Sequence, residues 1–464
     1  MKMRAEHRAI GIILIVALSG FLMGFDGSLF TGAVIFIEGK FELSKLALGW
    51  AVTSHTLAAT LSIFLAGPVA DRFGRRRVLR AAALIFLASS VVTAASENFA
   101  TLIVGRMLSG LGVGAVLVAA PMYIAEISPP ALRGRMVSFN QLFIVIGISL
   151  AFISNYLIVR LEDFSFAWLT ALNLVEWNWR WMLGIGALPA IIYLFALFFV
   201  PESPRWLAMH GQTDAAKHIL VRLHGAAFAE TELAELRESL SREAGKRDAR
   251  LRDLWAPQLR GVLGLGILVG IFQQITGISS VLAYATVIFE RAGAGSDASF
   301  MQTVFVGLVN LVFTVFALLL IDRVGRRPLM LFGLVGMCVC LVLTSYGFRD
   351  TGGGLNAGLV LGGMLGFVAS FAISIGPVMW VLLSEIFPNR VRGLAISCVG
   401  LVNSSVCFTV QLLFPWQMQR FGGAHTFLIY AIFALVGLVL LIKILPETRG
   451  RSLEQLEESL VRNS

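Results

Sequence analysis

Charged residues are scarce in this chain of 464 residues, and their scarcity excludes an ordinary water-soluble fold. Only 14% of the residues are charged and 57% are hydrophobic, whereas soluble domains carry roughly 25% charged residues. The mean hydropathy of +0.82 points the same way. A soluble protein of this composition would expose too much apolar surface to water, so we expect a membrane protein.

Cysteine is also rare, with four residues that all fall inside apolar stretches: Cys338, Cys340, Cys398 and Cys407. Their spacing matches neither a disulfide framework nor a metal site, so we interpret them as packing residues and expect no metal or other cofactor. A nucleophile, base or metal-ligating group facing a common site is missing as well. The sequence therefore argues against an enzyme.

Long apolar stretches take the place of these features. About 20 apolar residues cross the hydrocarbon core of a membrane, and we predict about twelve such helices. The fold class is thus an all-α membrane protein. The predicted spans are 9–32, 48–70, 78–96, 100–125, 136–159 and 181–200 in the first half, and 260–290, 300–321, 328–347, 356–385, 393–415 and 422–445 in the second.

Short charged motifs recur slightly more than half the chain apart, which indicates a duplication. Asp71–Arg76 and Asp322–Arg327 differ at one position, Phe against Val. Two further pairs are Glu126 with Arg133 against Glu385 with Arg392, and Pro201-Glu202-Ser203 against Pro446-Glu447-Thr448. We predict two parallel six-helix repeats, at 1–200 and 259–445, a cytosolic helical linker at 201–258 and a cytosolic tail at 446–464.

The formal charge of +9 is explained by topology rather than by a nucleic-acid partner. Most of the 37 Lys and Arg residues fall in the N-terminal segment, in every second loop, in the linker and in the tail. By the positive-inside rule both termini face the cytoplasm, and the lipid bilayer is the expected environment. Within the linker, 214–224 and 230–240 show helical spacing, which favours a structural connector over a catalytic or signalling domain.

An aspartate lies where lipid disfavours it. Asp26 falls in the first predicted span, where a carboxylate costs roughly 2.5–3.5 kcal/mol. Arg106, in the fourth span, is the one basic residue that we place well inside the apolar region. A carboxylate that loses its proton when Arg106 approaches and regains it when Arg106 withdraws would couple transport to protons. The alternative is a static buried ion pair, but the glycines around Asp26 suit a mobile or broken helix.

The polar residues of the second half are neutral. Gln273 and Gln274 carry amides that match a hydroxyl-rich ligand. Trp380 follows a Gly-Pro break, and its indole could pack on a sugar ring, although an interfacial belt aromatic is the alternative. Gln141 and Asn403 are weaker signals, since intramembrane amides commonly join helices. We interpret His55, in the second span, as a packing or pore-lining residue rather than a ligand.

The charged motifs fall at predicted cytoplasmic helix ends, where water accommodates charge. Their acidic and basic members can pair between neighbouring helix ends, so we predict a conformational role, whereas positive-inside topology alone is the alternative. The predicted gating residues are Asp71, Arg75, Glu126, Arg133 and Glu202 in the first half and Asp322, Arg326, Glu385, Arg392 and Glu447 in the second.

Taken in order, these segments resemble the sugar porters of the major facilitator superfamily. The matching motifs are Gly24 to Gly32, Gly67 to Arg76, Pro121 to Arg135, Pro201 to Leu207, Gln273 to Gly277, Asp322 to Arg327, Gly376 to Arg392 and Pro446 to Leu453. The resemblance implies alternating access by two six-helix bundles around a monosaccharide. It also implies that the cytoplasmic ion pairs lock the outward-facing state.

The resemblance assigns roles to individual residues as well. Asp26 occupies the position that distinguishes proton symporters from passive facilitators, and Arg106 matches its partner. The sugar-contacting positions of the family correspond to Gln141, Gln273, Gln274, Ser279, Trp380 and Asn403.

Three positions depart from the family pattern. Ser279 replaces an Asn, Ile148 replaces a second Gln of the fifth span, and Ser404 replaces a Trp. Fewer sugar contacts would shift the preferred ligand toward a deoxysugar, a less hydroxylated pentose or polyol, or another small polar solute.

The sequence as a whole predicts a secondary active transporter. It would import a monosaccharide or related polyol with a proton, without another cofactor, as a monomer in a bacterial inner membrane. A passive sugar facilitator and a transporter of another small polar solute are the nearest alternatives. A sugar receptor or a polyspecific drug exporter fits less well.

Overall fold

The computed structural model is nearly all helical and describes residues 2–128, 133–161, 173–244, 251–256, 259–350, 354–388 and 391–448. The helices before the linker are α1 (Lys2–Lys40), α2 (Lys45–Phe73), α3 (Arg75–Ala94), α4 (Phe99–Ile127), α5 (Arg133–Leu161), α7 (Leu174–Gly184) and α8 (Ala187–Ala196). The linker contains α9 (Pro204–Met209), α10 (Thr213–His224), α11 (Ala226–Ala244) and the 3-10 turn η1 (Leu251–Trp255).

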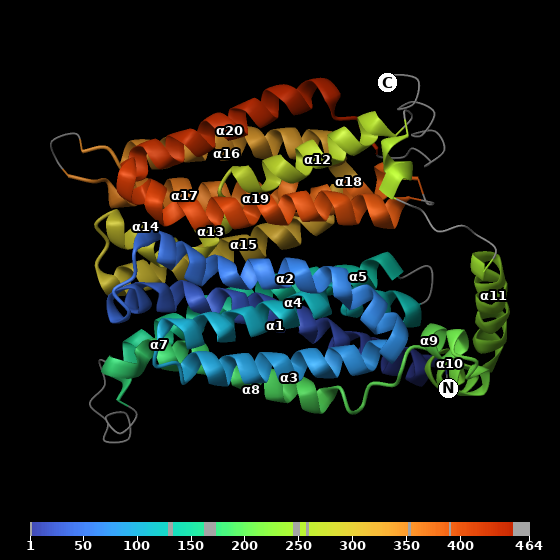
Figure 1. Ribbon diagram of the computed structural model, residues 1–464. Coiled ribbons are helices and arrows are strands. Elements are labelled where there is room, and N and C mark those ends of the chain that lie inside the picture. The colour runs from blue at the N-terminus through green and yellow to red at the C-terminus, as the bar shows by residue number, and fades with distance from the viewer. Residues whose placement is uncertain are drawn as a thin grey trace. The chain divides into compact units, whose positions relative to one another are not determined.

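The helices after the linker are α12 (Arg260–Ile275), α13 (Ile278–Ala283), α14 (Ala285–Arg291), α15 (Ser296–Val324), α16 (Arg326–Gly347), α17 (Ala357–Ile373), α18 (Ile375–Ile386), α19 (Arg392–Arg420) and α20 (Gly422–Ile444). Figure 1 shows their order along the chain by colour.

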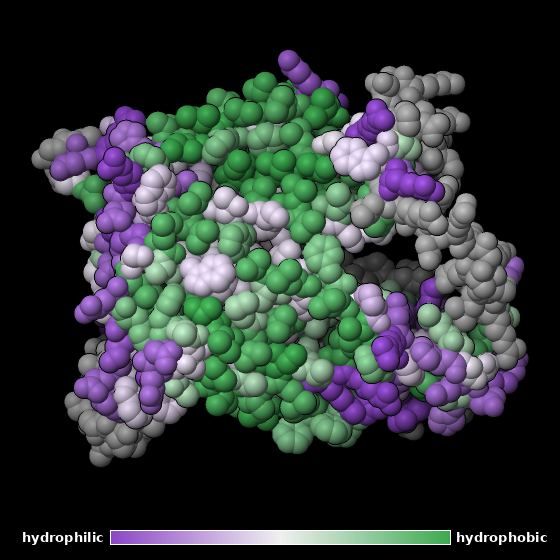
Figure 2. All heavy atoms as spheres, viewed as in Figure 1, coloured by the Kyte–Doolittle hydropathy of each residue, from purple (hydrophilic) through white to green (hydrophobic). Residues whose placement is uncertain are grey.

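Twelve helical segments within the described residues are long and apolar enough to cross a membrane, as the sequence predicts. Six precede the linker and six follow it. Hydrophobic side chains cover the middle of the helices, whereas hydrophilic side chains gather at their ends (Figure 2). This pattern matches a hydrocarbon layer between two aqueous surfaces.

Two spans are broken close to residues of the predicted site. The seventh span is interrupted between α12 and α13, where Gly277 has a φ of 88° that favours glycine. The tenth is interrupted at Ser374, between α17 and α18. The sequence places this second break at Gly376-Pro377, but Pro377 lies in the first turn of α18, where the missing N–H would have no helical partner.

The helix around Asp26 is expected to be mobile or broken. A break is wrong, because α1 runs without interruption from Lys2 to Lys40, whereas mobility stays a prediction. The glycines of this segment serve close packing instead. A Cβ at Gly24 would lie 2.0 Å from the carbonyl oxygen of Ile144, and one at Gly20 would lie 2.4 Å from that of Asn140. Small residues thus let α1 and α5 approach closely, as is common in membranes.

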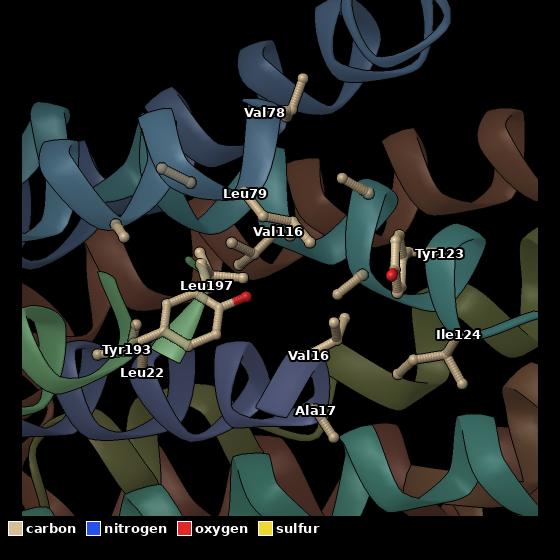
Figure 3. Packing of buried hydrophobic residues seen from close by; sticks show 14 of the residues in the cluster. Val16, Ala17, Leu22, Val78, Leu79, Val116, Tyr123, Ile124, Tyr193 and Leu197 are labelled. Carbon is tan, nitrogen blue, oxygen red and sulfur yellow. The ribbon is translucent and has the colours of Figure 1, made fainter. Parts of the chain in front are cut away.

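The chain forms two compact units by its contacts. The first contains residues 1–29, 54–151 and 180–248. Its core includes Val16, Leu79, Val116 and Tyr193, from α1, α3, α4 and α8, which lie together in Figure 3. These residues are at most 1% exposed, so the four helices share one packed interior.

The second unit contains residues 30–53, 152–179 and 249–464. It therefore includes one end of α1, where Thr31 Oγ1 donates to the carbonyl oxygen of Leu282 over 3.1 Å and Phe36 stacks on Phe300. α16 packs on α17 and α20, and α12 packs on α19. The predicted domain boundaries follow the sequence repeat, and they stay a prediction.

The linker helices enclose a small apolar core, made by Trp206, Leu207, Ala216, Leu220, Ala229 and Leu233. Ser203 begins α9 by accepting a hydrogen bond from the N–H of Trp206 at 3.3 Å, and Pro204 follows at the first helical position. α10 and α11 cover the two predicted linker segments, so the prediction of short helices here is confirmed.

Candidate functional site

Asp26 lies among polar groups from two other helices of the first unit. The Ser109 hydroxyl of α4 donates a hydrogen bond to Asp26 Oδ2. Arg106, one turn earlier on α4 and 4% exposed, acts electrostatically on the carboxyl group. His55 Nε2 of α2 is 3.9 Å from the same carboxyl oxygen. We call Asp26, His55, Arg106 and Ser109 the Asp26 cluster.

Glycines fix this geometry by bringing α2 and α4 together. A Cβ at Gly110 would lie 2.2 Å from the carbonyl oxygen of His55, and one at Gly114 would lie 2.4 Å from that of Ala59. Ser62 adds a hydrogen bond from its hydroxyl to the carbonyl oxygen of Leu111, 2.8 Å long. The spacing of Gly110 and Gly114 is the small-xxx-small pattern of membrane helix pairs. As a result Ser109 and His55 face Asp26 from neighbouring backbones.

His55 is the member of the cluster that sequence reasoning undervalued. Within the part of the chain that the structure describes, its Nε2 atom is buried and has no hydrogen-bond partner. It is therefore not a satisfied packing residue. The sequence showed that His55 is a titratable side chain in an apolar span. It could not show that His55 lies close to Asp26, because this distance depends on how α1 and α2 pack.

Four predicted sugar-site residues meet in the second unit, and we call Gln273, Gln274, Ser279 and Asn403 the amide cluster. Asn403 Nδ2 donates to Gln273 Oε1 over 2.7 Å and to the carbonyl oxygen of Gly270 over 2.9 Å. Gln274 Nε2 lies 3.5 Å from Asn403 Oδ1. Ser279 Oγ donates to Gln274 Oε1 over 2.5 Å. One network thus joins α12, α13 and α19.

The helix break at Ser374 takes part in this network. Gln273 Nε2 donates to the carbonyl oxygens of Gly376, at 3.1 Å, and Ile375, at 3.4 Å. Both carbonyls lie in the first turn of α18, where they are close to the interruption of the tenth span. The first turn of α18 is therefore anchored to the amide cluster through Gln273.

Gln411 extends the network by two turns of α19. Its Nε2 atom donates to the carbonyl oxygen of Ser279 over 3.1 Å, and the residue is 8% exposed. Asn403, Cys407 and Gln411 are spaced four residues apart and so share one face of α19. Sequence reasoning missed Gln411, although this spacing was visible.

The remaining two predicted sugar-site residues are exposed. Trp380, on α18, is 44% exposed, and its ring lies 4.0 Å from the position of a Cβ at Gly400 of α19. Gln141 is exposed on α5 and belongs to the first unit. Their roles in binding stay predictions.

The predicted gating residues of the first unit form a compact charge network. Arg75 Nη2 lies 2.9 Å from both Asp71 Oδ1 and Glu126 Oε1. Ser203 donates to the other oxygen of Glu126. Glu202 accepts a 3.1 Å hydrogen bond from the N–H of Arg76, so its negative charge caps the N-terminus of α3.

The second unit repeats this arrangement. Arg326 Nη2 is 2.7 Å from Glu385 Oε1, and Thr448 Oγ1 donates to Glu385 Oε2 over 2.6 Å. Glu447 accepts hydrogen bonds from the N–H groups of Arg326 and Arg327, both 3.1 Å long, and caps α16. The sequence repeat is therefore also a repeat of contacts.

Glycine is required at the matching turns before α3 and α16. Gly74 and Gly325 have φ angles of 96° and 102°, which favour glycine. A Cβ at Gly74 would lie 2.4 Å from an oxygen of Glu202, and a Cβ at Gly325 would lie 2.8 Å from an oxygen of Glu447.

Three other predicted gating residues are less informative. Arg392 Nε donates to the carbonyl oxygen of Phe387, whereas the side chains of Arg133 and Asp322 lie outside the described residues.

Comparison with known proteins decides the family. The family model "Sugar (and other) transporter" matches residues 12–460. The chain belongs to this family of sugar transporters. Its members are transporters, and this one is a multi-pass integral membrane protein. The predicted sugar-porter membership and fold class are confirmed.

The relatives of this sugar transporter align over nearly their whole lengths. The arabinose-proton symporter of Bacillus subtilis is 36% identical over 98% of this chain and 96% of the relative. The D-xylose-proton symporter of Escherichia coli is 35% identical over 96% and 94%. The inward-open structure of the xylose transporter XylE from E. coli has a TM-score of 0.83, with 32% identity over 97% of this chain and 99% of the other.

Proposed function

We propose that this sugar transporter imports a monosaccharide or related polyol together with a proton by alternating access. The observation that carries the proposal is Asp26, a carboxyl group in a membrane-spanning helix, in contact with Ser109 and within electrostatic reach of Arg106. A carboxyl group in this position avoids an unpaired buried charge either by binding a proton or by pairing with Arg106. It can therefore exchange the proton for the ion pair at a small cost in free energy.

The amide cluster is the proposed sugar site. Its side chains already hydrogen-bond one another, so they are held in place before a ligand arrives. Hydroxyl groups can replace the longer of these bonds, such as the 3.5 Å contact between Gln274 and Asn403. Trp380 and Gln141 complete the proposed set of contacts, with the indole face packing on the sugar ring.

A pentose is the favoured cargo. Ser279 is shorter than the Asn that the family carries there, and its hydroxyl is engaged with Gln274. Two of the relatives are named for pentoses, arabinose and xylose. A ligand with fewer hydroxyl groups leaves fewer of them without a hydrogen-bond partner in a site that has few free donors. Such a site therefore favours a pentose over a hexose.

We also propose the coupling ion, the orientation in the membrane and the gates of the transport cycle. Protons serve as the coupling ion, with no other cofactor and no enzymatic step. The protein acts as a monomer in the lipid bilayer of a bacterial inner membrane with both termini in the cytoplasm. The charge networks around Glu126 and Glu385 act as cytoplasmic gates, which hold neighbouring helix ends together until the protein opens inward.

Uptake into proteoliposomes tests the proposal. With D-xylose, L-arabinose and D-glucose as labelled probes, an inward proton gradient should drive accumulation of at least one sugar above its external concentration. A protonophore should abolish accumulation but not equilibration. Equilibration without accumulation would indicate a passive facilitator, and no sugar movement at all would contradict the proposal.

A further inference from the structure

The imidazole of His55 lies beside Asp26 without bonding to it. The Nε2 to Oδ2 distance is 3.9 Å, beyond the roughly 2.7–3.2 Å of a hydrogen bond. The atom is nonetheless buried and, among the described residues, has no other hydrogen-bond partner. A buried polar atom left unpaired costs free energy, so its position needs a reason.

Burial is the first reason why this site favours a neutral ring, because a charged imidazole would lose its hydration here, and a neighbouring charge is the second. Arg106 acts electrostatically on both Asp26 and His55. A second cation beside the guanidinium would be repelled, which favours a neutral ring with one acceptor nitrogen. In the tautomer that carries its proton on Nδ1, Nε2 is the acceptor, and it has no proton to share with an ionised carboxylate.

Protonation of Asp26 removes this mismatch. A carboxylic acid carries an O–H donor, and Nε2 is an unpaired acceptor 3.9 Å from Asp26 Oδ2. Ser109 and Arg106 have the opposite preference, because a hydroxyl donor and a cation both stabilise the carboxylate. Asp26 thus has His55 as the partner of its protonated form, and Ser109 and Arg106 as the partners of its ionised form.

We propose that His55 is a positioning residue of the proton site that accepts a hydrogen bond from the protonated carboxyl group of Asp26. It holds the proton-loaded state after Arg106 withdraws, whereas Ser109 holds the unloaded state. The carboxyl group therefore loads its proton at a higher pH than Ser109 and Arg106 alone would allow. This inference rests on the proposed proton coupling through Asp26.

The other elements that pack against this part of α1 bring no further charge to Asp26. Ile144 of α5, which packs against Gly24, is uncharged. Tyr193 of α8 interacts with Ser19, which lies two turns from Asp26 along α1. Asp26, His55 and Arg106 are thus the titratable groups of the described residues that the contacts place at this point.

Infrared difference titration of the purified protein tests the proposal without any sugar. The C=O stretching band of the protonated Asp26 carboxyl is assigned by its loss in Asp26→Asn, and its half-titration pH is measured between about pH 5 and about pH 10. His55→Phe keeps the ring volume but removes the acceptor. We expect the half-titration pH to fall by about one unit, which corresponds to the loss of one hydrogen bond.

Two further variants separate this effect from altered packing. His55→Gln places an amide oxygen near the position of Nε2 and should restore most of the shift. Ser109→Ala removes the donor to the carboxylate and should move the half-titration pH upward. An unchanged or raised value in His55→Phe, or equal values in His55→Phe and His55→Gln, would overturn the proposal.

The readout distinguishes this proposal from the proposed function. The infrared band of Asp26 titrates whether or not the protein carries sugar. If no sugar is transported but the half-titration pH still depends on His55, only the proposed symport is contradicted. Proton-driven uptake with a His55-independent titration would contradict only the role of His55. A variant that loses its helical amide signal is replaced by His55→Leu, for which the same fall is expected.

Discussion

Individual side chains in this transporter form two polar clusters inside apolar spans. Asp26 contacts a hydroxyl donor and lies near an imidazole and a guanidinium, and each residue comes from an apolar span. Gln273, Gln274 and Asn403 form one network in the other unit. The proposed proton and sugar functions thus fall on different sets of residues.

Loss of Asn403 should weaken sugar binding. Asn403→Leu removes the donor to Gln273 Oε1 and to the carbonyl oxygen of Gly270, together with the amide that a sugar hydroxyl would contact. We expect the loss of these polar contacts to weaken sugar binding by about 1–3 kcal/mol. The KM for D-xylose should rise roughly 5- to 150-fold. Ser405→Ala, an exposed position on the same helix, is the control and should leave the KM unchanged. Equal KM values in both variants would remove Asn403 from the site.

At the scale of helices, backbone approach at small residues positions the functional side chains. α2 and α4 meet at Gly110 and Gly114, and α1 and α5 meet at Gly20 and Gly24. The number of spans was predictable from apolar length, as was the repeat of the charged turns. The continuity of α1 was not, because glycine in a sequence serves flexibility and close packing equally well.

Gly110→Ala should destabilise the protein, although alanine normally favours a helix over glycine by about 1 kcal/mol. The added Cβ would lie 2.2 Å from the carbonyl oxygen of His55, so α2 and α4 must separate. We expect a Tm several degrees lower in detergent. Gly11→Ala, on α1 with nothing within 4 Å of its Cβ, should keep or raise the Tm. A Gly110→Ala protein as stable as Gly11→Ala would contradict the close approach.

Across the whole molecule, the two halves share the charge networks at their helix ends but not the polar groups within their spans. Arg75 with Glu126 and Arg326 with Glu385 have matching geometry. The sequence allowed this prediction because acidic and basic residues recur at matched offsets. It could not place His55 against Asp26 or Gln411 against Ser279, since those contacts depend on how separate helices pack.

Neutralising a gate residue should shift the conformational equilibrium. Glu126→Gln or Glu385→Gln weakens the pair with Arg75 or Arg326, so the inward-facing state should become more populated. Single cysteines introduced on the cytoplasmic side should then react faster with a thiol reagent. Glu235→Gln, at an exposed site of the linker helix α11, serves as the control. Equal reaction rates in gate and control variants would contradict the gating role.

Proton-coupled import requires that sugar and proton cross the membrane together, with Asp26 carrying the proton. A rapid D-xylose jump onto proteoliposomes on a solid-supported membrane measures the charge that accompanies the sugar. We expect a sustained inward current in the wild type and none in Asp26→Asn, which should still exchange labelled D-xylose across the membrane. An equal current in Asp26→Asn, or sugar uptake by the wild type without any current, would contradict it.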